Sequence, residues 1–440
     1  QLEDEEIVDI FNVILKENRL RGDREYKMLG WLLYKALLKN SIGKKIQDLR
    51  ELKTVEKIKV EMRFNGDDNP FAHWPWEYLY CQPNTYGGNG EYFLATEQKL
   101  ILSRPVKASI EELQETIRIL LVAPGPPSSG IEQPERHQKI FGLALLAYRE
   151  LFDKIRSIFS TEELKSMIEI HELVATEEKS QDTGEMVYVL SLDKFESVVK
   201  DIKPHIIHFF GHGRIDKGGG GGQVAFTNLN GQRKWVPDNV FAKAIESGNT
   251  RFVFLQACET GALAPYRAIS GVARNLVDYN IPAVVAMQCK IDQESAITFT
   301  QSFYAKLAEN GIIEDAVQEG RYRVEKTPLR KLGAEEDEKD FAFGIPVLYV
   351  NDRTPLFKLQ KDNQEKDRRS TQGVKVFCLE CAQSAAIIAR HCPTGCGEFV
   401  DRPQPNCREQ DCPQKILKWH KICAVCGTPN NQYEPKKSAP

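Results

Sequence analysis

The sequence predicts an α/β fold in which a mainly parallel sheet is covered by helices on both faces, followed by a small cysteine-rich module. Two observations support this prediction. Short, continuously apolar runs alternate with helical stretches through the middle of the chain, and eight of the eleven cysteines lie close together near its C-terminus. Such apolar runs are typical of parallel strands that are buried on both faces.

The elements are expected in the following order. Amphipathic spacing predicts helices over 3–18 and 24–40, and strands follow at 58–64 and 99–106, on either side of the aromatic segment 73–80. The buried strands of the main sheet are expected at 116–123, 168–175, 205–210, 251–257, 281–287 and 345–350. The helices between them are expected at 136–158, 191–202, 237–247, 265–279 and 293–309, with another after Gly311. Pro, Ser and Gly predict mobile loops at 124–135 and 218–222.

A chain of 440 residues is too long for one ordinary core, so several units are expected. We assign 1–110 to helices and strands that pack on the sheet and 111–360 to the main α/β domain. The polar segment 361–373 is a linker, 374–430 is the cysteine-rich module, and 431–440 is a flexible tail.

Composition and charge narrow the function classes. A net charge of -3 provides no general field for nucleic acid or membrane, and no apolar run approaches the ~20 residues that a membrane span needs. No secretory signal is visible, although a chain that begins with Gln1 leaves a longer native N-terminus open. Clustered cysteine pairs are typical of metal ligands in a reducing compartment, so we expect a cytoplasmic protein.

A histidine and a cysteine each follow an apolar strand. HIIHFFGHG (205–213) places His212 between two glycines, and FVFLQACETG (252–261) contains Cys258. Both motifs fall where a parallel strand ends, at the carboxyl edge of the sheet, where open α/β sheets form their sites. The glycines would let a substrate backbone approach closely.

This pairing suits nucleophilic catalysis. A nearby imidazolium stabilises the thiolate, which is the attacking species, and His212 would then protonate the leaving amine. The backbone N–H groups of Cys258 and Gly213 are candidates for an oxyanion hole. A cysteine after a strand is by itself more often a small buried hydrophobe. The two motifs together, 46 residues apart, match the caspase pattern in which the His lies about 50 residues upstream of Q-A-C. Glu259 departs from that pattern, because Arg, Gln or Gly is usual there.

Over roughly 1–355 the chain resembles the CHAT peptidases, a caspase-related branch of the clan that includes separase. The resemblance rests on PWEYLY (75–80), HIIHFFGHG, LQACETG, SGVARNLVDYNIPAVVAMQ (270–288) and the helices of 292–321. It implies a caspase-like fold with His212 and Cys258 as the catalytic dyad, and a protein substrate.

Other residues near these motifs have plainer interpretations. His205 and His208 are expected to be packing residues, Cys289 to be structural, and the aromatic residues of 74–80 to belong to a core. For substrate specificity, Glu259 and Asp292 are acidic candidates, and Arg214 and Arg267 are basic ones. The absence of the caspase-type Arg after Cys258 favours a P1 residue other than Asp.

The tail contains two similar halves, each with four cysteines and with ten residues between the inner two. Four thiolates form a closed tetrahedral structural zinc site, and metal binding would supply the folding energy of so small a unit. We therefore predict a double zinc ribbon with two structural zinc ions and no catalytic metal. The ligands are Cys378, Cys381, Cys392 and Cys396 in the first site, and Cys407, Cys412, Cys423 and Cys426 in the second. Cross-braced pairing and disulfides remain alternatives. His391 and His420 are expected outside the ligand sets.

The function expected from these observations is a cysteine endopeptidase that cleaves a specific protein partner in a regulated prokaryotic signalling or antiviral defence system. The zinc module would recruit the substrate or an activating protein. One alternative is a catalytically inactive caspase-like scaffold that uses the zinc ribbon for protein interaction. Another is a nucleic-acid-binding zinc protein, which is disfavoured because the tail carries no basic stripe. No membrane partner is expected.

Overall fold

The computed structural model divides the chain into two compact units, Gln1–Leu359 and Gln360–Pro440. In the first unit it describes residues 22–64, 71, 74–88, 90–113, 115–126, 147–215, 221–246, 248–259, 265–288, 291–327, 341–351 and 353–357. In the second unit it describes 375–377 and 384–386. For 215, 258–259, 265–271 and the second unit, only the backbone is described. The predicted helix at 3–18 and the predicted linker at 361–373 lie outside these residues.

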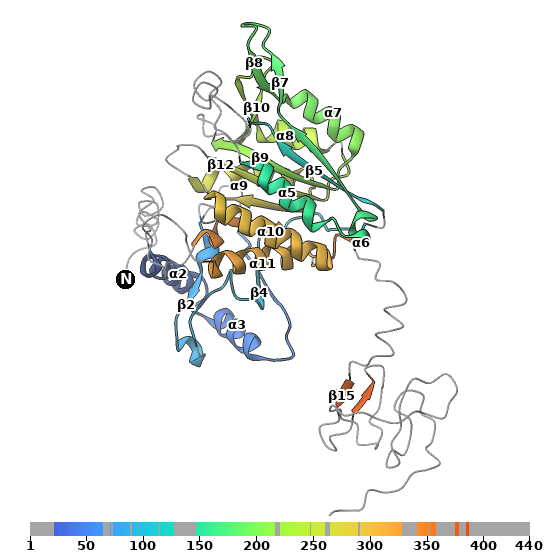
Figure 1. Ribbon diagram of the computed structural model, residues 1–440. Coiled ribbons are helices and arrows are strands. Elements are labelled where there is room, and N and C mark those ends of the chain that lie inside the picture. The colour runs from blue at the N-terminus through green and yellow to red at the C-terminus, as the bar shows by residue number, and fades with distance from the viewer. Residues whose placement is uncertain are drawn as a thin grey trace, which may run out of the picture. The chain divides into compact units, whose positions relative to one another are not determined.

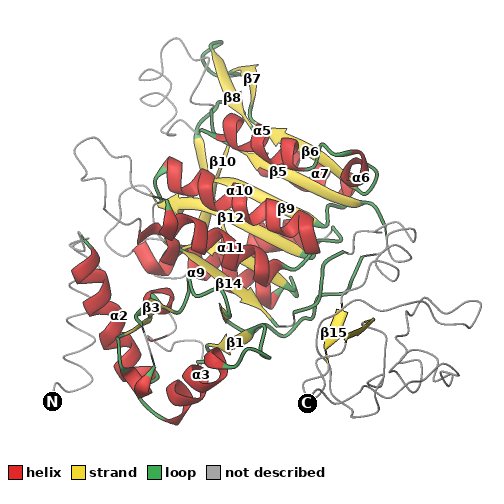
Figure 2. Cartoon of the chain, turned by 60° about the horizontal axis from the view of Figure 1, so that its bottom comes forward, coloured by secondary structure: helices red, strands yellow, loops and turns green. Residues whose placement is uncertain are grey.

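A mixed, mainly parallel sheet forms the centre of the first unit, and its described part has eight strands (Figures 1 and 2). They are β5 (Ile117–Ala123), β6 (Ile168–Val174), β9 (Ile206–Ile215), β10 (Gly222–Thr227), β11 (Arg233–Pro237), β12 (Phe252–Glu259), β13 (Ala283–Met287) and β14 (Pro346–Val350). The pairs β6–β5, β5–β9, β9–β12 and β12–β13 are parallel. The pairs β13–β14, β9–β10 and β10–β11 are antiparallel. The predicted α/β class with a mainly parallel sheet is confirmed.

Helices cover both faces of this sheet (Figure 2). One core contains residues of α5 (Tyr148–Ile158), α10 (Gln293–Asn310) and α11 (Ile313–Lys326). The other contains residues of α7 (Leu192–Ile202), α8 (Asp238–Glu246) and α9 (Pro265–Asp278). Successive strand residues alternate between the two cores: in β12, Phe254 belongs to the first and Leu255 to the second. This alternation follows from the two-residue period of a strand, and explains why these strands are apolar throughout.

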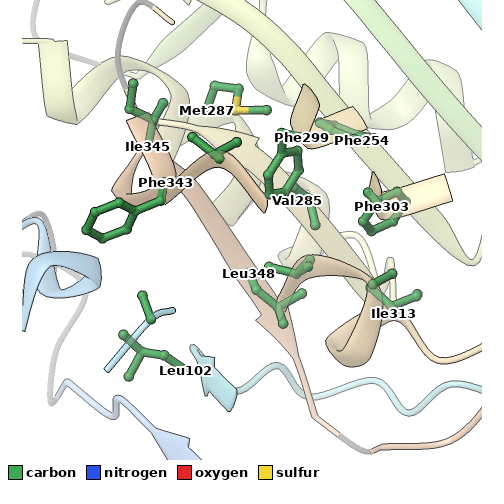
Figure 3. Packing of buried hydrophobic residues seen from close by; sticks show 14 of the residues in the cluster. Leu102, Phe254, Val285, Met287, Phe299, Phe303, Ile313, Phe343, Ile345 and Leu348 are labelled. Atoms are coloured by element: carbon green, nitrogen blue, oxygen red, sulfur yellow. The ribbon is translucent and has the colours of Figure 1, made fainter. Parts of the chain in front are cut away.

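Aromatic rings fix α10 against the central strands (Figure 3). Phe254 of β12 contacts Phe303 edge to face at a centroid distance of 5.3 Å, and Phe299 at 5.9 Å. All three rings are fully buried. Burying a phenylalanine side chain contributes about 1.5–3 kcal/mol, so this contact holds the first half of β12 firmly against α10.

The described residues of the N-terminal part form two α-helices and two small sheets, and buried residues of these elements belong to the first of these cores. These are α2 (Asp23–Leu37), α3 (Ser41–Glu51), parallel β1 (Ile58–Glu61) with β4 (Leu100–Ser103), and antiparallel β2 (Tyr80–Cys81) with β3 (Tyr92–Phe93). The single helix predicted over 24–40 is wrong at its end. Asn40 accepts hydrogen bonds from the backbone N–H groups of Ile42 (2.9 Å) and Gly43, and so begins a second helix.

The sequence interpretation missed several elements. Among them are the hairpin of β7 (Thr176–Lys179) and β8 (Met186–Val189), the short helix α6 (Glu162–Lys165), and the strands β10 and β11. The loop predicted over 218–222 is wrong for Gly222, which begins β10 and donates its N–H to Asp238 Oδ2 at 2.8 Å. Residues 218–220 and 127–135 of the two predicted loops lie outside the described part.

In the second unit, β15 (Lys375–Phe377) pairs antiparallel with β16 (Ser384–Ala386). No described helix combines the length and apolar character that crossing a bilayer requires.

Candidate active site

His212 and Cys258 lie opposite each other on neighbouring parallel strands. The register of β9 with β12 pairs Phe210 with Gln256 and His212 with Cys258. Cys258 is the last residue but one of β12, and His212 lies three residues before the end of β9. The strand predicted at 205–210 is therefore longer than expected and includes His212. Neighbouring strands are about 4.8 Å apart, and register partners belong to the same face of a sheet. The two motifs therefore converge at one place on one edge.

The surroundings of His212 are compact. The His212 side chain is only 6% exposed. A Cβ on Gly211 would lie 2.6 Å from Cε1 of the Phe209 ring, so packing against Phe209 favours a glycine at this position. The expected role of the glycines in substrate approach stays a prediction. Gly213 is a register partner of Val224 in β10 and of Glu259 in β12. The assignment of its N–H to an oxyanion hole stays a prediction.

A buried polar network lies beside the site on the same sheet face. His208 is four residues before His212, and Gln256 is two before Cys258. The His208 Nε2 lies 3.0 Å from the Gln256 Oε1, which also accepts from the Thr300 hydroxyl at 3.1 Å. The Tyr304 hydroxyl lies 3.3 Å from the His208 Nδ1. The network ties both site strands to α10. Sequence reasoning missed Gln256, Thr300 and Tyr304, although the Gln of LQAC was a visible signal.

His208 in β9 and His205, which directly precedes this strand, are packing residues, as expected. The His208 ring stacks on Phe254 at 4.3 Å, and burial lowers its pKa to about 3, so it stays neutral. His205 is fully buried and accepts a hydrogen bond from the Arg118 N–H at 3.1 Å. Its pKa is also lowered, first by burial and then by Arg118. The protonated, positively charged form of either imidazole is therefore disfavoured at neutral pH.

The aromatic segment 74–80 belongs to the core, as expected. Trp74, Trp76, Tyr78 and Tyr80 are all buried, and the Tyr78 hydroxyl donates to the Phe341 carbonyl at 2.8 Å. Between them, the buried Glu77 accepts a hydrogen bond from the Gln288 side chain at 2.8 Å, and forms an ion pair with Arg104 at 3.2 Å. Since Gln288 directly follows β13, this carboxylate anchors the carboxyl end of the strand next to β12.

The specificity candidates differ in what surrounds them. Asp292 caps α10, because its side chain accepts from the Ser295 N–H at 3.0 Å and from the Ser295 hydroxyl at 2.5 Å. Arg214 is half-buried and stacks on Trp235. Only the backbone is described for Glu259 and Arg267, and Cys289 lies outside the described residues.

The eight tail cysteines, His391 and His420 also lie outside the described residues. Within the residues described, no cluster of His, Cys, Asp and Glu could hold a metal ion. The zinc sites therefore stay a prediction.

Comparison with protein families identifies the first unit. The CHAT domain matches residues 29–371, most of the chain. This chain belongs to the CHAT domain family. The resemblance seen in the sequence motifs is thereby confirmed at the level of the family. No curated protein matches the chain.

Three solved structures show a distant likeness to this CHAT protein. The separase–securin complex of Saccharomyces cerevisiae aligns at 13% identity and a TM-score of 0.31, covering 65% of this chain and 15% of that one. The Arg-specific cysteine proteinase gingipain R aligns at 12% identity and a TM-score of 0.33, and the alignment covers 59% of this chain and 56% of that one. Pyridoxal kinase from Staphylococcus aureus aligns at 12% identity and a TM-score of 0.22, and the alignment covers 47% of this chain and 85% of that one. TM-scores this low carry no argument about activity.

Proposed function

We propose that this CHAT protein is a cysteine endopeptidase whose dyad is His212 and Cys258. The observation that carries the proposal is the register pairing of these two residues at the carboxyl ends of β9 and β12. A strand spacing of about 4.8 Å is short enough for an imidazole and a thiol to interact. The CHAT family match supports the same assignment.

The proposed reaction is acyl transfer. The Cys258 thiolate attacks the scissile carbonyl, and the protonated His212 donates its proton to the leaving amine. Water, activated by the same imidazole, then hydrolyses the thioester. Burial keeps His208 neutral, so the proposal assigns the proton transfers to His212 and not to His208.

We further propose that the tail binds two structural zinc ions and recruits the protein substrate or an activating protein, in a cytoplasmic prokaryotic signalling or defence system. The first cysteine pair, Cys378 and Cys381, falls in the segment between β15 and β16. Phe377 and Ser384, the described residues on either side of it, are register partners. Four thiolates in each half are the donor set of a closed zinc site.

The proposal is tested by profiling cleavage sites in a proteome-derived peptide library with the full chain and with the variants Cys258→Ala and His212→Ala. Wild type is expected to cleave, and both variants are expected to lose at least about a thousandfold in rate, as when a dyad member is removed. Cys81→Ala is the matched control, since Cys81 is a buried thiol far from these motifs in the sequence. It should retain activity.

A thiol-reactive peptide ketone provides a second readout. Mass spectrometry should find the label on Cys258 in wild type and not in His212→Ala, because the thiolate is lost with its partner. If Cys258 stays unlabelled while other thiols react and no peptide is cut, the catalytically inactive scaffold replaces the peptidase.

A further inference from the structure

Beside His212 the sheet carries a group of arginine and tryptophan side chains, which we call the Arg–Trp platform: Arg214, Gln223, Arg233 and Trp235. Arg214 lies two residues after His212 on β9 and therefore on the same face. The same face continues across β10 to β11. Arg214 is the register partner of Gln223 in β10. Ala225 lies two residues after Gln223 on the same face, and it is the register partner of Trp235 in β11. Arg233 is two residues before Trp235 on the same strand.

The platform is a built arrangement. The Arg214 guanidinium lies over the Trp235 ring at 4.3 Å, and its Nε donates to the Gln223 Oε1 at 2.7 Å. The Arg233 guanidinium lies over the same ring at 5.0 Å. Two cations therefore share one indole. Both guanidinium carbons lie within cation–π range of the indole ring, and the Arg214 guanidinium is also held by Gln223.

Part of the platform is accessible to solvent and positively charged. Arg233 is exposed, and Trp235 and Arg214 are half-buried. In the described part of the chain Arg233 forms no ion pair with Asp or Glu. A planar guanidinium that is already oriented by an aromatic ring binds a carboxylate through two parallel N–H donors, at a lower entropic cost than a free side chain.

Resting on the proposed peptidase function, we propose that the Arg–Trp platform binds an Asp or Glu side chain of the protein substrate, two or more residues from the scissile bond. Arg214 lies about 7 Å beyond His212 along β9, since a strand rises about 3.3 Å per residue. An extended substrate advances by the same rise, so the first position that can reach the platform is about two residues from the bond cleaved. This preference is separate from the P1 residue.

The test compares wild type with Arg233→Gln and Arg233→Glu in the same peptide-library profiling. Wild type is expected to favour Asp or Glu at one position two to four residues from the cleaved bond. Arg233→Gln should lower kcat/KM for those peptides about fivefold, the size expected for one partly exposed carboxylate pair. It should leave peptides that are neutral there unchanged. Arg233→Glu should shift the preference to Lys or Arg.

Lys234→Gln is the matched control, because Lys234 is the next residue, is exposed, and pairs with Phe226, whose side chain belongs to the opposite core. The platform proposal is overturned if wild type cleaves without an acidic preference, or if Lys234→Gln acts as strongly as Arg233→Gln. It is also overturned if a single-stranded oligonucleotide inhibits wild type but not Arg233→Gln while no acidic preference exists, which would assign the platform to nucleic acid. Absence of all cleavage by wild type refutes the peptidase itself, and the platform proposal with it.

Discussion

The hydroxyl group of Tyr304 is expected to stabilise the two strands of the candidate active site through one hydrogen bond. An amide oxygen only accepts, so the short contact of the His208 Nε2 with the Gln256 Oε1 assigns the proton of the neutral imidazole to Nε2. The His208 Nδ1 is then an acceptor, and the Tyr304 hydroxyl must donate to it. Replacing Tyr304 by Phe removes this donor and changes little else.

The expected cost follows from burial. His208 and Tyr304 are both fully buried, and the variant leaves the His208 Nδ1 without its partner in a dry environment. An unsatisfied buried acceptor of this kind costs about 1–3 kcal/mol. Phe retains the ring contacts of Tyr304 with Phe303 at 5.2 Å and Phe159 at 5.9 Å. The loss of stability should therefore be close to that of the hydrogen bond alone.

Urea unfolding followed by tryptophan fluorescence measures this cost. Tyr304→Phe should lower the midpoint with an unchanged slope. The control is Tyr322→Phe on α11, because Tyr322 is half-buried and its ring stays beneath Lys326; it should change stability by less than about 0.5 kcal/mol. If Tyr304→Phe unfolds at the same urea concentration as wild type, the network does not hold β9 and β12 to α10, and the assignment of the imidazole proton is wrong.

Two further predictions concern a buried carboxylate and the tail. Burial raises the pKa of Glu314 to about 7 from 4.5, so the folded state binds more protons than the unfolded state between these values, and stability falls by about 3 kcal/mol as pH rises through that window. In thermal melts at pH 4.5–8, Glu314→Gln should abolish this loss of stability. The control Glu294→Gln, at an exposed position at the start of α10, should leave the loss in place. A wild-type melting temperature that does not change over this pH range contradicts the prediction. For the tail, elemental analysis should find two zinc ions per chain, and a chelator should expose 374–440 to proteolysis while cleavage of short peptides continues. Thiol titration that finds disulfides in place of zinc contradicts this.

The central strands could be predicted because they are buried on both faces, and a continuous apolar run is the direct consequence. The direction of β14 could not be predicted, because a strand such as Pro346–Val350 has the same apolar pattern whether it pairs parallel or antiparallel with β13. The strands β10 and β11 were missed because the five glycines of 218–222, the last of which begins β10, suggested a loop, although Val224 and Phe226 belong to one core. The end of the first helix before Asn40 had one local indication in the sequence, because asparagine is a residue that often caps helices. The amphipathic spacing of the apolar residues over 24–40 gave no sign of an interruption.

For the site, sequence reasoning could place His212 and Cys258 at strand ends but could not fix their register. A shift of one residue between β9 and β12 would move one of them to the opposite face, and only the pairing itself decides this. The same holds for Gln256 and Tyr304, which lie 48 residues apart in the sequence and meet through α10 and His208. The Arg–Trp platform depends on β10 and β11, which the sequence interpretation did not contain.

The position of His212 depends on a change of partner along β9. On one side β9 pairs with β5 through residues 206–209 and then with β10 through 213–215. On the other side it stays paired with β12 through 206–213. Among these register pairs, residues 210–212 therefore have a partner only in β12. Open α/β sheets bind ligands where neighbouring strands diverge at the carboxyl edge. The sequence of β9 cannot encode this gap, because it arises from where β5 ends and β10 begins. The histidine is thus located by three strands that are distant from one another in the chain.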